Sequence, residues 1–395
     1  MAAADRAEMK DGMNRPIFVV GSPRSGTSIL TWCLGQHPNI IPLEESDWLG
    51  DLAVNLALYY QTGTSRGDYS LLSSMDVNKA EFFAVFGKTI NDLILRHDVD
   101  LEKKRWRQAA GPTTPDDHFD TEFRVKKRWV DGTPEYSFYI CGLRKLFPEA
   151  LFIHIFRDVT SVVRSMLHFH QVSGGSLVAN EREAYSYWLS TVSNCLLAER
   201  AYGAGVVFRL RYSDLIDTPE AALRAVFGFL DEHYAPECLA PLAQRINSSH
   251  VPPDFEIDLR KIDPSLIEQA TQLYQQVEGS SQSVDVSPAA IEEIEAAFDE
   301  RVQFVATLGS EYRDALQKIA KLKKQNQRIA ARAERVVMED KKKGATVRNL
   351  RASWKHSKWL DHLFGAVPKS VSATKQKEQG DSSRGNGASR SPGVE

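Results

Sequence analysis

The residues Gly21–Ser28, with the sequence GSPRSGTS, have the types and spacing of a phosphate-binding loop. The apolar run Ile17–Val20 before them fits a buried strand, and residues 26–36 fit an amphipathic helix. A glycine turn between a strand and a helix N-terminus directs backbone N–H groups and the helix dipole at a phosphate. The loop of nucleoside triphosphatases carries a lysine where this chain has Thr27. Arg24 is the nearest cation, so the pattern favours a single phosphate beside a reacting group.

A second candidate anion site lies at Arg157, which follows a predicted buried strand at residues 151–156. Ligands of open α/β sheets bind at the carboxyl ends of the strands, which is where this arginine falls. Ser165 lies two helical turns further along. Taken alone, Asp158 reads as a helix cap and Arg157 as a surface side chain. Together with the glycine loop, the pair indicates a second phosphate contact.

These segments resemble the sulfotransferases that use 3′-phosphoadenosine 5′-phosphosulfate (PAPS). The family's loop for the 5′-phosphosulfate is similar to PRSGTS at residues 23–28, and its motif for the 3′-phosphate is similar to Arg157 with Ser165. The other matches follow in the family's order: His37-Pro38, Glu44-Glu45, Trp129, Asp131, Thr133-Pro134, Leu146-Phe147-Pro148, Phe152, Tyr212, Asp214, Leu215 and Pro219. The resemblance covers about residues 14–235.

The resemblance implies a role for each of these phosphate motifs. The 5′-phosphate and the sulfuryl group would be held by Arg24, Ser25, Gly26, Thr27 and Ser28, and the 3′-phosphate by Arg157 and Ser165, with Tyr212 near the nucleotide. Sulfuryl transfer, like phosphoryl transfer, needs positioning, stabilisation of charge on the oxygens and removal of the acceptor proton. We expect PAPS as the co-substrate and no required metal.

Glu45 is the candidate general base, because it falls where the carboxylate-using branch of the family, which includes the tyrosylprotein sulfotransferases, places its base. Glu44 is the close alternative. In the interpretation without a catalytic role, both glutamates are simply solvated residues of a loop. A carboxylate in a pocket can have its pKa raised toward the working range. His37 is expected to cap the end of the first helix, and His154 to lie in the core.

One position departs from the family's pattern. Related sequences often carry a lysine before the Thr-Pro pair, where it neutralises charge on the leaving group, and this chain has Gly132. Either Arg24 performs that role alone, or Lys126, Lys127 or Arg128 reaches into the site.

The first 277 residues alternate between strand and helix patterns, which predicts an α/β fold with a mostly parallel, P-loop-like sheet flanked by helices. Strands are expected at residues 16–21, 128–131, 151–156 and 206–211. Helices are expected at 26–36, 46–60, 78–97, 135–146, 158–170, 180–203 and 218–231.

Residues 278–288 are predicted to be a linker, and residues 289–343 a coiled-coil helix. A heptad counted from Ile291 keeps apolar residues at positions a and d, apart from Arg301 and Asn326. A lone asparagine at position a fixes register in parallel dimers. The pattern predicts a homodimer, and a single amphipathic helix lying on the body is the alternative.

The end of the chain is basic and then low in complexity. Residues 344–370 combine lysines with tryptophan, leucine and phenylalanine, as in segments that lie in a membrane interface. Residues 371–395 are predicted to be disordered.

Charge and cysteine content limit the location and the partners. The net charge of −3 hides an acidic body, residues 1–317, and a basic segment, residues 318–377. An acidic body argues against binding of nucleic acid. The N-terminal residues lack the apolar core of a signal peptide, and the four cysteines are scattered, so we expect a cytoplasmic protein, peripheral at the inner face of the membrane if residues 344–370 bind lipid.

The sequence as a whole predicts a PAPS-dependent sulfotransferase that acts on a hydroxyl acceptor. A carbohydrate or a glycolipid is the first choice of acceptor, and these or a small metabolite are favoured over secreted protein tyrosines. Two alternatives come from other classes. One is a P-loop-type kinase or nucleotide-binding protein, and the other is a non-catalytic coiled-coil assembly protein.

Overall fold

The computed structural model describes residues 15–101, 103–104, 126–170, 174–243, 251–258, 260, 262–282 and 285–354. The predicted disordered tail and most of the predicted membrane segment, from residue 355 on, lie outside these residues. Within the described ranges, no helix has the length and the apolar character needed to cross a membrane.

A five-stranded sheet forms the centre of the body, with the order β2-β3-β1-β4-β5. All neighbouring strands pair in parallel. The strands are β1 (Ile17–Val20), β2 (Ile40–Pro42), β3 (Arg128–Asp131), β4 (Leu151–Phe156) and β5 (Val207–Arg211). The predicted α/β class with a parallel sheet is therefore confirmed.

Side chains alternate along β1 and enter two different cores. Phe18 and Val20 join the cluster on one face of the sheet, whereas Ile17 and Val19 join the cluster on the other. All four side chains are fully buried. Strands covered on both faces read as continuous apolar runs, which is why the sequence showed them so clearly.

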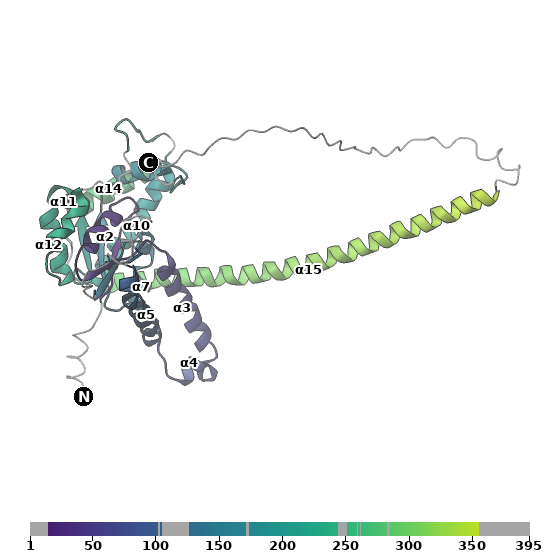
Figure 1. The fold of residues 1–395 in the computed structure, drawn as a ribbon, viewed down its shortest axis with the longest axis horizontal. Helices are drawn as coiled ribbons and strands as arrows, with labels where there is room; N and C mark the ends of the chain where they lie inside the picture. The colour runs from purple at the N-terminus through teal and green to yellow at the C-terminus, as the bar shows by residue number, and fades with distance from the viewer. Residues whose placement is uncertain are drawn as a thin grey trace. The chain divides into compact units, whose positions relative to one another are not determined.

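Helices cover both faces of the sheet (Figure 1). One face packs against α2 (Thr27–Gly35), α11 (Tyr212–Asp217), α12 (Pro219–Leu230), η4 (Pro236–Leu239) and α13 (Ala240–Ala243). The other packs against α3 (Trp48–Thr64), α5 (Lys79–Arg96), η3 (Pro134–Phe138), α7 (Ile140–Leu146), α10 (Glu181–Tyr202) and the start of α15 (Pro288–Trp354). The short η1 (Gly67–Tyr69) and α4 (Leu71–Ser74) follow α3. A third apolar cluster joins α8 (Val159–His168) to α10 and α14 (Pro264–Glu278).

Several elements differ from the sequence-based expectations. The edge strand β2, the helices α11 and α14 and the short elements η1, α4, η4 and α13 were not predicted. The helix expected at residues 135–146 is divided into η3 and α7. The division has a physical reason: Tyr136 and Ser137 turn inward, where Tyr136 binds the Ser46 carbonyl and Ser137 binds Gly21.

The predicted linker is bound to the edge strand β5. The Gln282 side chain accepts from the Arg209 N–H at 2.9 Å and donates to the Val207 carbonyl at 2.5 Å. The Ser287 N–H donates to the Arg200 carbonyl at 2.8 Å. Gln282 therefore binds the edge of β5 that faces away from β4, which limits unwanted strand pairing there, and Ser287 is bound to α10.

The long helix α15 begins as part of the body. Ile294, Phe298 and Val302 are buried in the same core as α3 and α7. The compact body extends to Tyr312, and residues 313–395 form a separate unit. The predicted boundary at 343/344 lies inside one continuous helix that runs to Trp354.

Candidate active site

The predicted phosphate loop joins β1 to α2, and its first glycine is fixed in place. Gly21 has φ +150°, and a Cβ there would lie 2.5 Å from the Ile155 carbonyl oxygen. The Ser137 hydroxyl accepts from the Gly21 N–H at 2.9 Å and donates to the Gly21 carbonyl at 3.0 Å. Because only glycine fits and both backbone groups are bound, the loop leaves the strand in one conformation.

The second glycine of the loop opens the N-terminus of α2. Gly26 is the N-cap residue with φ +108°, and a Cβ there would lie 2.7 Å from the Tyr212 ring. A glycine cap supplies no side-chain acceptor to the first N–H groups of the helix. These groups, at Thr27 and Ser28, are therefore available to an anion, which the helix dipole also favours.

The structure brings the two predicted phosphate motifs together. Arg24, in the left-handed region with φ +69°, donates from Nε to Ser165 Oγ at 3.2 Å. Its guanidinium carbon lies 4.8 Å from the centroid of the Phe169 ring. Residues 141 positions apart thus meet at the carboxyl edge of the sheet.

Arg157 completes the pair of cations. Its guanidinium donates to the Arg24 carbonyl at 2.9 Å and lies 4.2 Å from the Tyr212 ring centroid. The Trp188 indole donates to the Arg157 carbonyl at 3.3 Å. Burial and the charge of Arg157 lower the pKa of Arg24. Two guanidiniums held this close fit a ligand with more than one negative charge.

Of the two candidate bases, Glu45 contacts the phosphate loop helix. Ser28 Oγ donates to Glu45 Oε1 at 2.7 Å. Both Glu44 and Glu45 are exposed on the loop that follows β2. The hydrogen bond places the Glu45 carboxylate beside the first turn of α2, where the resemblance puts the sulfuryl group.

A carboxylate that the sequence analysis missed lies near Glu45. Glu135 is half-buried and accepts from the Tyr187 hydroxyl at 3.3 Å. Burial, with the charges of Asp47 and Glu45, raises the pKa of Glu135. Its place directly after the Thr133-Pro134 match was an available signal, whereas nothing in the sequence pointed to Tyr187.

Position 132, where related sequences often carry a lysine, is crowded by α2. A Cβ on Gly132 would lie 2.0 Å from Thr31 Oγ1, so the position is closed by α2. The suggestion that a neighbouring cation replaces the lysine is wrong for Arg128. That side chain is buried at the amino end of β3, where it donates to the Arg15 and Leu230 carbonyls at 2.9 and 2.7 Å.

Lys126 and Lys127 precede β3 at the same amino end. The strand separates them from the phosphate loop by four residues, or about 13 Å of extended chain. They are therefore too far from the loop to replace the lysine, and Arg24 and Arg157 are the cations that the structure brings to it.

Two histidines lie outside the site, as expected. His37 accepts from the Asn39 N–H through Nδ1 at 3.2 Å and contacts the His233 carbonyl at 2.9 Å, whereas Gln36, and not the expected His37, is the C-cap of α2. His154 is fully buried in β4, with Nδ1 2.6 Å from Glu199 Oε1. Although burial opposes it, contacts with Cys195 and Glu199 raise the pKa of His154 to about 9. Both side chains have structural roles.

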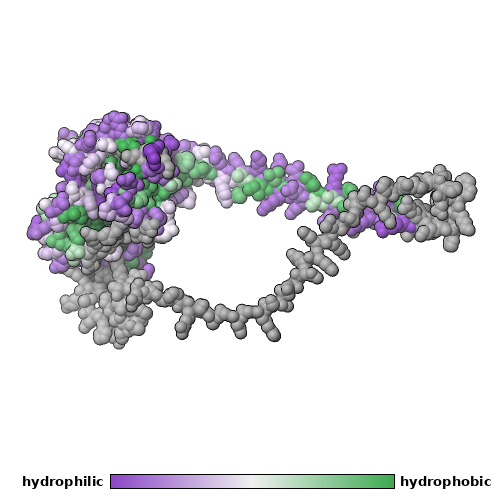
Figure 2. Space-filling model, turned by 90° about the horizontal axis from the view of Figure 1, so that it is seen from above, coloured by the Kyte–Doolittle hydropathy of each residue, from purple (hydrophilic) through white to green (hydrophobic). Residues whose placement is uncertain are grey.

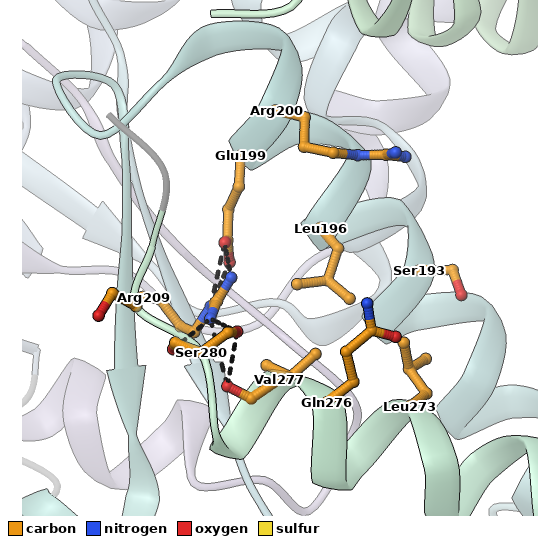
Figure 3. Close-up of a pocket in the computed structure, with 10 residues that line it drawn as sticks. Ser193, Leu196, Glu199, Arg200, Arg209, Leu273, Gln276, Val277 and Ser280 are labelled. Atoms are coloured by element: carbon orange, nitrogen blue, oxygen red, sulfur yellow. Dashed lines mark hydrogen bonds and ion pairs between the residues drawn. The ribbon is translucent and has the colours of Figure 1, made fainter. Parts of the chain in front are cut away.

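A pocket of about 340 Å³ lies apart from the phosphate loop, between α10 and α14 (Figure 3). Its floor is the ion pair of Glu199 with Arg209, which also contacts the Val277 and Ser280 carbonyls at 3.5 Å. These two charges are already bound to each other and to the backbone, so they fasten α14 to the sheet. Among the described residues, no group of His, Cys, Asp or Glu side chains is suited to hold a metal ion.

The proteins to which this chain is similar include several sulfotransferases. A provisional protein-tyrosine sulfotransferase of Caenorhabditis briggsae is 22% identical over 231 residues, 58% of this chain and 70% of that protein. The omega-hydroxy-beta-dihydromenaquinone-9 sulfotransferase Stf3 of Mycobacterium bovis is 29% identical over 115 residues, 27% of this chain and 30% of that protein. Among solved structures, sulfotransferase STF9 of Mycobacterium avium is 17% identical, with a TM-score of 0.37 over 72% of this chain and 81% of that one.

The model of the sulfotransferase family matches residues 16–236. These limits enclose the glycine loop, the glutamate pair and the Arg157 motif, and they cover more than half of the chain. The chain therefore belongs to the sulfotransferase family.

Proposed function

We propose that this enzyme transfers the sulfuryl group of PAPS to a hydroxyl acceptor by in-line attack, with Glu45 as the general base. The observation that carries the proposal is the contact of Arg24 with Ser165. It joins the loop expected to hold the 5′-phosphosulfate to the motif expected to hold the 3′-phosphate. PAPS, the donor that the family implies, has a phosphate at each of these positions.

The chain offers separate groups to the two ends of the donor. The N–H groups at the start of α2, including that of Ser28, the Thr27 hydroxyl and Arg24 would hold the 5′-phosphosulfate, while the Ser28 hydroxyl donates to Glu45. Arg157 and Ser165 would hold the 3′-phosphate, with Tyr212 beside Gly26 and the Arg157 guanidinium. Charge-assisted hydrogen bonds of this kind are about twice as strong as neutral ones.

In the reaction, the acceptor oxygen forms a bond to sulfur while the bond from sulfur to the 5′-phosphate oxygen breaks. The acceptor proton passes to the Glu45 carboxylate. The leaving phosphate keeps the electron pair of the broken bond, and Arg24 and the N-terminus of α2 stabilise its charge. The Ser28 hydroxyl, 2.7 Å from Glu45, holds the carboxylate next to the loop that carries the sulfuryl group.

A carbohydrate or a glycolipid fits the acceptor side best. Glu44, Glu45, Asp47 and Glu135 give this side a negative charge, and the charges of Asp47 and Glu45 act on Glu135. Like charges repel an acidic glycan or an acidic peptide, whereas sugar hydroxyls donate hydrogen bonds to carboxylates. The exposed Trp48 adds an aromatic surface next to the same loop.

The test is transfer of labelled sulfate from PAPS to neutral glycans, glycolipids, anionic glycans and tyrosine peptides. We expect label on a neutral glycan or a glycolipid, and a loss of about 10²- to 10⁴-fold in rate for Glu45→Gln. Label on tyrosine peptides alone would contradict the acceptor class. A full rate for Glu45→Gln with a loss for Glu44→Gln would assign the base to Glu44.

We also propose that the exposed part of α15 forms a homodimeric coiled coil. Hydrophobic and hydrophilic side chains alternate along this helix (Figure 2). Leu308, Ile319, Leu322 and Ile329 occupy heptad positions a and d and are about half exposed. Light scattering on the full chain should give the mass of a dimer, and a monomer would refute the coiled coil.

We propose that the protein is cytoplasmic and lies at the inner face of the membrane. All four cysteines are buried free thiols, which suits a reducing compartment. The basic, aromatic residues 344–370 would supply the lipid contact. Sedimentation with anionic vesicles tests this contact, and recovery of the whole chain in the supernatant would contradict it.

A further inference from the structure

The loop that carries Glu45 is fixed to the sheet on both sides of the glutamate. Before it, the Leu43 N–H donates to the Val130 carbonyl at 2.8 Å and continues the pairing of β2 with β3. After it, the Ser46 N–H donates to a side chain of the turn that follows β3, at 2.8 Å. Only two residues lie between these fixed points, so small shifts at Ser46 move Glu45 directly.

Both backbone groups of Ser46 are bound by side chains. Its N–H donates to Thr133 Oγ1, and its carbonyl accepts from the Tyr136 hydroxyl. Thr133 is in turn bound to Asp131: its hydroxyl donates to Asp131 Oδ1 at 2.7 Å, and its N–H donates to the same oxygen at 3.0 Å. The chain of contacts runs from the end of β3 to the residue after the base.

Asp131 determines which way the Thr133 hydroxyl points. A hydroxyl has one proton, and here that proton is directed to the aspartate. The lone pairs of the oxygen are then directed to the Ser46 N–H. Without the aspartate, the hydroxyl is free to rotate and to donate to the Ser46 carbonyl, 3.4 Å away.

A buried aspartate at this place is costly. Asp131 is fully buried, and burial raises its pKa to about 7. Its Oδ2 atom has no hydrogen-bond partner among the described residues. Buried polar groups that are hydrogen-bonded to one another hold each other in one orientation, as Asp131 and Thr133 do here.

We propose that Asp131 and Thr133 are positioning residues that hold Glu45 at the acceptor hydroxyl. The inference rests on the proposed function, in which Glu45 removes the acceptor proton. Misplacing a catalytic group by about 1 Å can cost about 10²-fold in rate. Substrate binding at the phosphate motifs does not involve this chain of contacts, so the effect should fall on kcat.

The first experiment compares Thr133→Val, which keeps the shape of the side chain and loses the hydroxyl, with Thr133→Ser, which keeps the hydroxyl. We expect Thr133→Val to lower kcat about 10- to 100-fold while the Kd for adenosine 3′,5′-bisphosphate changes less than about threefold. Thr133→Ser should restore most of the lost rate. Thr191→Val, at an equally buried threonine inside α10, is the matched control and should keep kcat.

The second experiment separates this inference from the proposed base. In a Glu45→Gln background, Thr133→Val should cost no further rate, because the group that it positions is gone. An equal loss in both backgrounds, or a normal kcat for Thr133→Val when Glu45→Gln is inactive, would overturn the positioning role. A fully active Glu45→Gln would instead overturn the proposed base.

A third variant avoids the risk that Thr133→Val does not fold. Tyr136→Phe removes the hydrogen bond to the Ser46 carbonyl and the interaction of the Tyr136 hydroxyl with Asp131, and it leaves the hydrogen bonds between Thr133 and Asp131 in place. We expect a smaller loss of kcat than for Thr133→Val, again without a change in nucleotide affinity. An unchanged kcat in a folded Tyr136→Phe would show that fixing Ser46 is unimportant and would overturn the inference.

Discussion

Replacement of Arg157 by glutamine should weaken binding of nucleotides that carry a 3′-phosphate and spare those that lack it. The guanidinium faces the Tyr212 ring and donates to the Arg24 carbonyl, so it borders the loop without being part of it. Loss of one hydrogen bond to a charged group costs about 1.5–3 kcal/mol. At about 1.4 kcal/mol per tenfold change, this predicts a Kd for adenosine 3′,5′-bisphosphate that rises about 10- to 150-fold.

Isothermal titration calorimetry with adenosine 3′,5′-bisphosphate and with AMP measures this difference. The affinity for AMP should change less than about threefold if the glycine loop keeps its shape, since AMP has only the 5′-phosphate. Arg164→Gln is the matched control, because Arg164 lies on α8, the helix that begins after Arg157, and donates to the Pro252 carbonyl at 2.8 Å instead. It should leave both affinities unchanged.

Two results would refute the reasoning for Arg157. An equal loss of affinity for both nucleotides means that the substitution damages the loop through the Arg24 carbonyl. In that case Arg157 does not bind the 3′-phosphate. Unchanged affinity for both nucleotides means that the 3′-phosphate binds elsewhere. Ser165→Ala gives an independent check, with an expected loss of about 0.5–1.5 kcal/mol confined to the bisphosphate.

Three further predictions concern stability, measured by urea unfolding. Gly132→Ala should cost about 1–3 kcal/mol, because its Cβ would lie 2.0 Å from Thr31 Oγ1. Thr31→Ala removes this oxygen and keeps a good helix former in α2, so it should recover much of the loss, and additive losses would contradict the steric cause. Glu199→Gln should cost about 3–5 kcal/mol, because it leaves the charges of His154 and Arg209 buried without their partner, and a loss below about 1 kcal/mol would refute the ion cluster. The pKa of His154, about 9, lies above its unfolded value of about 6.5, so its contribution is complete below pH ~6.5 and is lost as the pH rises through about 9. The wild type should therefore lose more stability than Glu199→Gln between pH 7 and pH ~9.5, and parallel pH profiles would contradict this assignment.

The sheet and the phosphate loop could be predicted because their signals are local. Buried parallel strands are apolar on both faces, and Gly21 and Gly26 mark positions where a side chain would strike the Ile155 carbonyl or the Tyr212 ring. The edge strand β2 was missed because it has three residues and ends in proline. A strand this short forms because it pairs with β3, and this pairing cannot be recognised from the sequence.

The contacts around the candidate base could not be predicted, because they join three loops distant in sequence. In the sequence, Asp131 and Thr133 stood out only because they match a motif of the sulfotransferase family. Their relation to Ser46, 87 residues away from Thr133, appears when β2 and β3 align side by side. Similarly, Gly132 read as a missing lysine until its contact with Thr31 showed that α2 closes the position.

The heptad pattern shows the limit of periodicity as a signal. Ile294, Phe298 and Val302 recur every fourth residue and are buried in the body, although the first two fit a coiled coil equally well. Arg301, a polar residue at position d, lies 4.6 Å from the Tyr139 ring centroid, which accounts for a charge at that place. A helix face has the same spacing whether it packs on its own body or on a partner. Since the body uses the face up to about Val302, the proposed dimer must be formed by the exposed residues from Leu308 onward.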